Sequence, residues 1–154
     1  MATTVTAADL TVTITETISL NGVQYGNTIN KTFSTQGQVD QRIMSIEAVE
    51  IGTMTDIFSF TTVDGQGTGV AADYAYFRIT NLDDTNFVTL QVTAAATNDT
   101  YWIKLKAGES FMLMDNEMDA IDASTTFVAF SDVTKVSANA NTASCDIEYT
   151  VITA

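Results

Sequence analysis

Apolar and polar residues alternate with a period of two along much of the chain, which predicts β-strands with one buried face. The clearest run covers residues 9–20, where the polar positions are mostly threonine and the apolar positions are Leu10, Val12, Ile14, Ile18 and Leu20. Asn21-Gly22 follows directly and predicts a two-residue type I′ turn, because both residue types tolerate a positive φ. The return strand is expected to carry Val23, Tyr25, Ile29 and Phe33, with a bulge at Gly26.

Shorter runs of the same kind predict further strands, separated by turn residues. They cover residues 42–51, 56–63, 74–82, 87–92, 101–105, 111–114, 127–133 and 145–152. The run at 42–51 shifts phase and is compatible with a helix, but its β-branched content favours a bulged strand. A glycine-rich stretch at 63–69 predicts a loop, and one helical turn is expected within 115–123.

About nine or ten short strands at near-regular spacing predict an all-β fold. We expect one antiparallel β-sandwich domain, jelly-roll-like, over residues 1–154, with residues 1–8 as an N-terminal extension. Alternation is the same in a jelly roll and in an immunoglobulin-like sandwich, so the strand order stays open.

The edges of such sheets need protection against pairing with other chains. Natural β proteins often use proline and lysine for this, but the chain has no proline and only six lysines and arginines together. Two explanations stay open: negative charge and bulges protect the edges, or partner subunits cover them.

Composition and charge exclude several classes of function. The net charge of −13 argues against nucleic acid as a partner, because phosphate binding needs clustered lysine and arginine. The chain has no histidine and one cysteine, which excludes Ser-His-Asp triads, Cys-His pairs and histidine-ligated zinc. No segment resembles a signal peptide or approaches the ~20 apolar residues of a membrane span, so we expect synthesis in a reducing cytoplasm and no membrane partner.

The remaining candidates for chemistry are weak. Asp115, Glu117 and Asp119 have the spacing of an EF-hand, but Ala120 and Thr126 replace its glycine and its last glutamate. We interpret Asp83-Asp84 as a turn device and Cys145 as a buried, inert thiol on an apolar strand face. No carboxylate pair stands out for glycoside hydrolysis. The sequence therefore predicts neither an enzyme nor a cofactor nor a metal site.

One aromatic residue is expected on the surface. Trp102 alternates with Tyr101 and Ile103 and shares a strand face with Lys104 and Lys106. Exposed aromatic residues mark protein interfaces, which makes Trp102 a candidate subunit contact. Stacking on a sugar is the alternative for this aromatic surface.

Four blocks of sequence resemble small structural proteins of tailed bacteriophage virions. The two main blocks are YFRITNLDDTNFVTL at 76–90 and IKLKAGESFML at 103–113. The blocks ISLNGVQYG at 18–26 and CDIEYTV at 145–151 are similar to the same group. The resemblance covers about a third of the chain, and it implies a structural role with no catalytic residues to carry over.

Within this group we expect a capsid decoration (cement) protein that contacts the major capsid protein and stabilises the shell. A homo-oligomer is expected, with a trimer favoured. A surface that faces packaged DNA would be repelled at this net charge, so an outer position on the virion is favoured. The alternatives are a tail, neck or tail-tip subunit, or a glycan- or receptor-binding module of a fibre.

The strand at residues 9–20 is the candidate subunit-contact element, because a terminal strand can add to a neighbour's sheet. Its candidate contact residues are Leu10, Val12, Ile14, Ile18 and Leu20. The alternative is that this strand belongs to the protein's own sandwich.

Overall fold

The computed structural model describes residues 6–50, 52–61, 69–95, 100–120, 126–127 and 129–154. Residues 1–37 with Ala154 form one compact unit, and Gln38–Thr153 form a second. We call the paired strands of the first, residues 8–36, the hairpin unit, and the second the sandwich. This division differs from the expected single sandwich over 1–154, because the strands before Gly37 pair only with one another.

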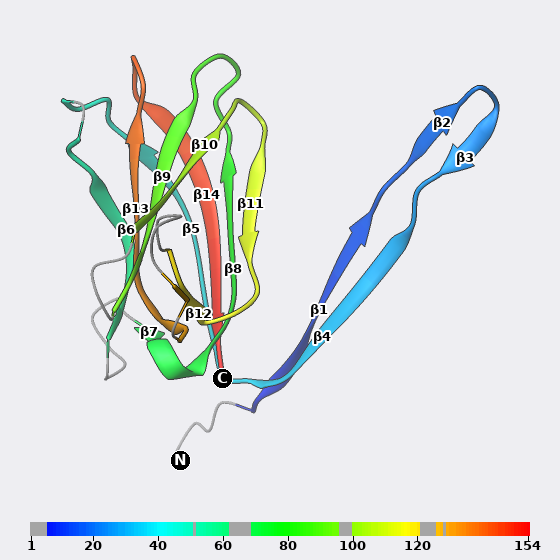
Figure 1. Cartoon of the computed structure of the whole chain (residues 1–154), viewed down its shortest axis with the longest axis horizontal. Coiled ribbons are helices and arrows are strands. Elements are labelled where there is room, and N and C mark those ends of the chain that lie inside the picture. The colour runs from blue at the N-terminus through cyan, green and yellow to red at the C-terminus, as the bar shows by residue number, and fades with distance from the viewer. Residues whose placement is uncertain (1–5, 51, 62–68, 96–99, 121–125, 128) are drawn as a thin grey trace. The chain divides into compact units, whose positions relative to one another are not determined.

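The hairpin unit contains two antiparallel strand pairs (Figure 1). β1 (Ala8–Thr15) pairs with β4 (Thr28–Gln36), and β2 (Ile18–Leu20) pairs with β3 (Val23–Tyr25). Asn21 and Gly22 connect β2 to β3 with φ angles of 52° and 79°. Two consecutive positive φ angles are those of a type I′ turn, as Asn21-Gly22 predicts.

The sandwich is an all-β structure of two sheets that face each other, and it confirms the predicted fold class (Figure 1). The first sheet has the order β10 (Thr100–Leu105), β9 (Val88–Ala94), β13 (Ser131–Ala140), β6 (Thr55–Thr61), β7 (Gly69–Val70). β12 (Glu117–Met118) also pairs with β13. The second sheet has the order β11 (Ser110–Leu113), β8 (Tyr74–Asn81), β14 (Cys145–Thr153), β5 (Gln38–Ile46). Among the described residues, all strand pairs in the two sheets are antiparallel except β6–β7, which is parallel.

Strand pairing in the sandwich is nested. The first long strand, β5, pairs with the last, β14, and the second, β6, pairs with β13. Further inside, β8 pairs with β11 and β9 pairs with β10. The chain from Gln38 onward therefore runs as a set of strand pairs within strand pairs, divided between two sheets.

The core lies between the two sheets and follows the predicted alternation. On β9 the inward side chains are Val88, Leu90, Val92 and Ala94. On β14 the predicted apolar face is buried, at Cys145, Ile147, Tyr149 and Val151. The ring of Tyr149 stacks on Phe77 of β8, with centroids 6.4 Å apart.

Two predicted elements differ from the structure. The strand predicted at 127–133 runs instead over Ser131–Ala140, because its small inward residues Ala138 and Ala140 gave little strand signal. Within 115–123, where a helical turn was expected, the described residues form β12, and residues 121–123 lie outside the described part.

The run at 42–51 is a strand as favoured, although it begins at Gln38 and ends at Ile46. The expected bulge is absent from β5, which pairs with β14 in continuous register, because the strand ends before the predicted shift of phase. Most of the predicted loop at 63–69 lies outside the described residues. The helical content of the described chain is the short 3₁₀ turn η1 (Ala71–Asp73). None of the described residues forms a helix that could cross a membrane.

Candidate functional site

From the pair Leu10–Phe33 to the Asn21-Gly22 turn, the hairpin unit keeps one register, and its register shift lies between Ala8 and Leu10. The β1–β4 ladder runs to the pair Thr15–Thr28, and the β2–β3 ladder begins at Ile18–Tyr25, so two residues separate the ladders on each strand. Within this gap the Glu16 backbone N–H donates to the Asn27 carbonyl at 2.9 Å. Alternation therefore continues across the gap, and each face of the hairpin is continuous.

One of these faces is apolar. It carries Leu10, Val12, Ile14, Ile18, Leu20, Val23, Tyr25, Ile29 and Phe33, interrupted by Glu16, Asn27 and Lys31. The five predicted contact residues thus lie together on this surface, which we call the apolar face. β1 belongs to neither sheet of the sandwich, in contrast to the alternative interpretation of this strand.

The opposite face is polar and internally bonded. The hydroxyls of Thr11 and Thr32 lie 3.3 Å apart, and the Thr13 hydroxyl donates to Asn30 Oδ1 at 2.9 Å. Thr15 and Thr28 form a third cross-strand contact at 3.3 Å. Because these polar groups satisfy one another and face water, this side of the hairpin needs no partner.

Gly26 allows the two strands to approach closely at the gap. Its φ is +138°, and a Cβ at this position would lie 2.2 Å from the Glu16 carbonyl oxygen. The predicted bulge at Gly26 is wrong, since the strands stay in register there. The glycine instead lets two backbones pass where no side chain fits.

The apolar face is largely exposed to solvent, which is unfavourable for an isolated pair of strands. Five of its side chains are between 52% and 57% exposed, namely Ile18, Leu20, Val23, Tyr25 and Ile29. Complete burial of such a side chain contributes about 1.5–3 kcal/mol, so covering the exposed halves would contribute about 4–7 kcal/mol in total. Isolated two-stranded hairpins are marginally stable in water. The apolar face is therefore a candidate contact surface.

Charge is distributed unequally between the two units. Residues 1–37 contain Asp9, Glu16 and Lys31, for a net charge of −1. Residues 38–154 contain the other 17 acidic and 5 basic residues, for a net charge of −12. Acidic surfaces of other molecules would thus repel the sandwich far more strongly than the hairpin unit.

Trp102 lies on β10, an edge strand of the first sheet, and is 50% exposed as predicted. A groove of about 570 Å³ runs beside it and is lined by Thr100, Tyr101, Trp102, Leu113, Met118, Asp119 and Ala120. On the same strand face, the Lys104 ammonium sits 3.9 Å from the centre of the Phe87 ring. The groove is mostly apolar, with Asp119 as its charged residue.

The sequence analysis missed two other exposed apolar groups. Val39 and Ile43 are each 65% exposed on β5, the edge strand of the second sheet. Val39 and Ile43 have odd numbers, whereas the inward Met44 and Ile46 have even numbers. The period of two along this strand therefore already indicated that Val39 and Ile43 face outward. Phe127 and Phe130 are also exposed, with ring centroids 4.9 Å apart.

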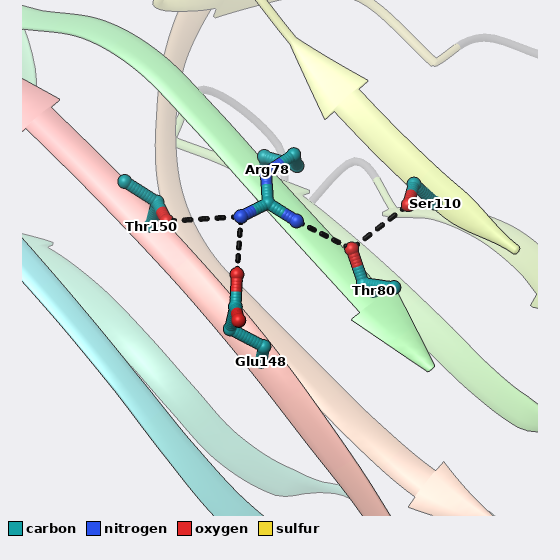
Figure 2. A network of polar contacts seen from close by, with 5 residues as sticks. All are labelled: Arg78, Thr80, Ser110, Glu148 and Thr150. Atoms are coloured by element: carbon teal, nitrogen blue, oxygen red, sulfur yellow. Dashed lines mark hydrogen bonds and ion pairs between the residues drawn. The ribbon is translucent and has the colours of Figure 1, made fainter. Parts of the chain in front are cut away.

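A network of polar side chains stabilises the second sheet (Figure 2). The Arg78 guanidinium donates to Glu148, to Thr80 Oγ1 at 2.6 Å and to Thr150 Oγ1 at 3.4 Å. Thr80 in turn contacts the Ser110 hydroxyl at 2.8 Å. These residues join β8, β11 and β14 across the sheet, which indicates a structural role for the arginine.

Two of the acidic residues considered as ligands, Asp83 and Asp115, act as local backbone acceptors. Asp83 Oδ1 accepts the backbone N–H groups of Asn86 and Thr85, and these bonds lower the pKa of the Asp83 carboxyl. Asp115 Oδ1 likewise accepts the Glu117 N–H at 3.1 Å. Within the described ranges, no group of acidic or cysteine side chains has the geometry of a metal site.

Cys145 is fully buried, and its thiol lies 3.6 Å from the Ala143 carbonyl. Burial raises the pKa of the thiol, and the nearby carboxylates of Asp83 and Asp146 raise it further. Since the thiolate is the reactive form, Cys145 has the environment of an inert thiol, in agreement with its prediction.

Comparisons with protein-family models, with curated proteins and with solved structures found no match to this chain.

Proposed function

We propose that this chain is a structural subunit of a tailed-bacteriophage virion, most specifically a capsid decoration protein on the outer surface of the shell. Its partner is the major capsid protein, and it acts by bridging neighbouring capsid subunits. The sequence blocks at 76–90 and 103–113, which resemble such proteins, are the starting point for the proposal. The structural features of both units support it.

The observation that carries the proposal is the amphipathic hairpin unit. Its apolar face exposes five large side chains by more than half, while its polar face is satisfied internally. Such a surface is typical of a contact with another protein, and an assembly subunit uses it to bind neighbours. Many copies of a modest contact, repeated by symmetry, reinforce a shell.

The finer fold assignment belongs to the same proposal. We propose that the sandwich is a jelly roll, since its nested pairs β5–β14, β6–β13, β8–β11 and β9–β10 give eight strands in two sheets. Jelly rolls occur in viral capsids and also in lectins and cupins, so this fold is compatible with a virion role without requiring it.

The negative charge favours an external position. The sandwich carries a net charge of −12 and would be repelled by the phosphates of packaged DNA. The same charge keeps the free subunit soluble before it binds the outer surface of the shell.

Binding to capsids tests the proposal directly. Purified protein is mixed with expanded, empty capsids, and the bound fraction is measured by co-sedimentation. We expect saturable binding that Ile18→Asp weakens, because a carboxylate would enter the contact surface. Ser19→Asp, which places the same charge on the polar face of the same strand, is the matched control and should bind normally.

Folded protein that fails to bind capsids would refute the decoration role. Six-fold rings of the isolated protein in electron micrographs would favour a tail or neck subunit instead. The groove beside Trp102 is the observation that favours a glycan-binding module, and saturable binding on a glycan array that Trp102→Ala abolishes would support that second candidate.

A further inference from the structure

The two opposite charges on the apolar face have a symmetric arrangement. Lys31 lies opposite Val12 in the β1–β4 ladder, and Glu16 lies opposite Asn27 in the gap between the ladders. The pair Ile14–Ile29 is midway between them, two residues from each. A positive and a negative group therefore flank an aliphatic centre at equal spacing.

We propose that the apolar face binds the same face of a second copy of this chain, with the two hairpins antiparallel about a twofold axis at Ile14–Ile29. In this arrangement Lys31 of each copy lies over the Glu16–Asn27 pair of the other. A parallel arrangement would place Lys31 beside Lys31 and Glu16 beside Glu16. Charge therefore selects the antiparallel pairing, and the interface is self-complementary as a twofold contact requires.

The charge distribution explains why copies meet through the hairpin unit. Two sandwiches with a net charge of −12 each repel one another, whereas two hairpin units with −1 each do not.

The size of the contact predicts a weak dimer. The ladder from Leu10 to Leu20 is about 37 Å long at ~3.4 Å per residue, and two strands are about 10 Å wide. Covering this face on both copies would bury roughly 800–1,000 Å² in total, which is at the lower limit for a specific interface. We therefore expect a dimer that dissociates at concentrations of about 10–100 µM.

This twofold pairing is not the trimer expected from the phage resemblance, and it does not depend on the decoration role. It is the pairing of the free protein in solution: the proposed capsid contact uses the same apolar face, so a subunit that binds the shell through this face leaves the dimer. A cyclic trimer needs a head-to-tail contact between two different surfaces of each subunit. In the proposed pairing both subunits contribute the same surface, the apolar face, which gives a twofold dimer. Monomeric protein that still binds capsids would overturn the pairing and leave the proposed function standing.

Charge exchange tests the pairing. In a homodimer of Lys31→Glu two glutamates face each other at positions 16 and 31, and in a homodimer of Glu16→Lys two lysines do so. We therefore expect the dissociation constant of each variant dimer to rise at least about tenfold. Analytical ultracentrifugation measures these constants. An equimolar mixture of the two variants matches both charge pairs again. We expect this mixture to form heterodimers, seen by native mass spectrometry, with an affinity within about threefold of the wild type.

A second pair of variants tests the apolar centre. Ile29→Asp should weaken the dimer by more than about tenfold, while Asn30→Asp, on the polar face of the same strand, should change it less than about twofold. Wild-type protein that stays monomeric at several hundred micromolar would overturn the proposal. Single charge variants that dimerise normally, or a mixture that forms no heterodimer, would also overturn it, whatever the folding of Ile29→Asp.

Discussion

Asn81 offers the sharpest test of how one end of the sandwich is held together. Its side chain is completely buried, and its Nδ2 donates to the carbonyls of Asn86 at 2.9 Å and Leu105 at 3.2 Å. Its Oδ1 accepts the Asp83 N–H at 3.1 Å. One amide thus fixes the turn after β8 and the end of β10. Asn81→Asp keeps the shape of this side chain and removes both donated bonds.

The expected cost follows from the groups left without partners. The carbonyls of Leu105, which is buried, and of Asn86, which is half-buried, each lose a donor. At about 1–3 kcal/mol per group, we expect a loss of about 2–5 kcal/mol in the free energy of unfolding at pH 7. The new carboxyl is buried and faces carbonyl oxygens, which holds its pKa in the folded state above the ordinary value of about 3.9. The folded protein then binds the proton more tightly than the unfolded chain, so the variant loses stability as the pH rises from about 4.

Urea unfolding of the variant and of the wild type at pH 4.5 and at pH 7.5 measures how much unfolding free energy the variant loses at each pH. We expect Asn81→Asp to lose more stability at pH 7.5 than at pH 4.5. Asn81→Leu should lose about 3 kcal/mol at both values, because it has no titratable group. Asn30→Asp, an exposed position, should stay within about 0.5 kcal/mol of the wild type. A penalty for Asn81→Asp below 1 kcal/mol at pH 7.5, or equal at both pH values, would refute this role of Asn81.

Three further predictions follow from the described contacts. Gly26→Ala forces a Cβ against the Glu16 carbonyl, so amide exchange over the hairpin unit should accelerate, while Gly37→Ala, whose Cβ would meet nothing closer than 3.5 Å, leaves it unchanged; equal exchange in both variants would contradict this. Cys145 should resist thiol reagents at pH 8 in native protein and react fully in denaturant, and rapid native labelling would be inconsistent with its burial. A double-mutant cycle of Arg78→Gln and Glu148→Gln should give a coupling energy of about 1 kcal/mol in unfolding experiments, and zero coupling would show that the ion pair in Figure 2 is not stabilising.

The strands with one clear apolar face could be predicted from the sequence. The runs from Leu10 to Leu20, where Glu16 is the exception, and from Cys145 to Val151 alternate with a period of two, so their strands could be predicted from local sequence. Asn21-Gly22 is a residue pair typical of one turn type, and the turn was predicted for that reason. The C-terminal part of β13 was missed because its inward residues are alanines, which pack beneath the larger side chains of neighbouring strands. That packing depends on tertiary contacts that alternation does not report.

The candidate site could be predicted only in part. The apolar positions from Leu10 to Leu20 and their return strand were predicted. Whether this strand joins the protein's own sandwich or a neighbour's sheet stayed open, because alternation predicts a buried face without saying what buries it. The self-complementary positions of Glu16 and Lys31 emerge only when the register joins residues on two strands. The close approach at Gly26 likewise depends on the backbone path, and the sequence alone suggested a bulge.

A reconstruction of the virion at residue resolution tests the central claim most directly, namely that this chain is a virion subunit whose apolar hairpin face binds other subunits. The account predicts density for the sandwich on the outer surface of the capsid. It also predicts that Ile18, Leu20 and Ile29 are buried against another protein chain. Density for this chain with these three side chains facing solvent, or particles that lack the chain altogether, would contradict the account.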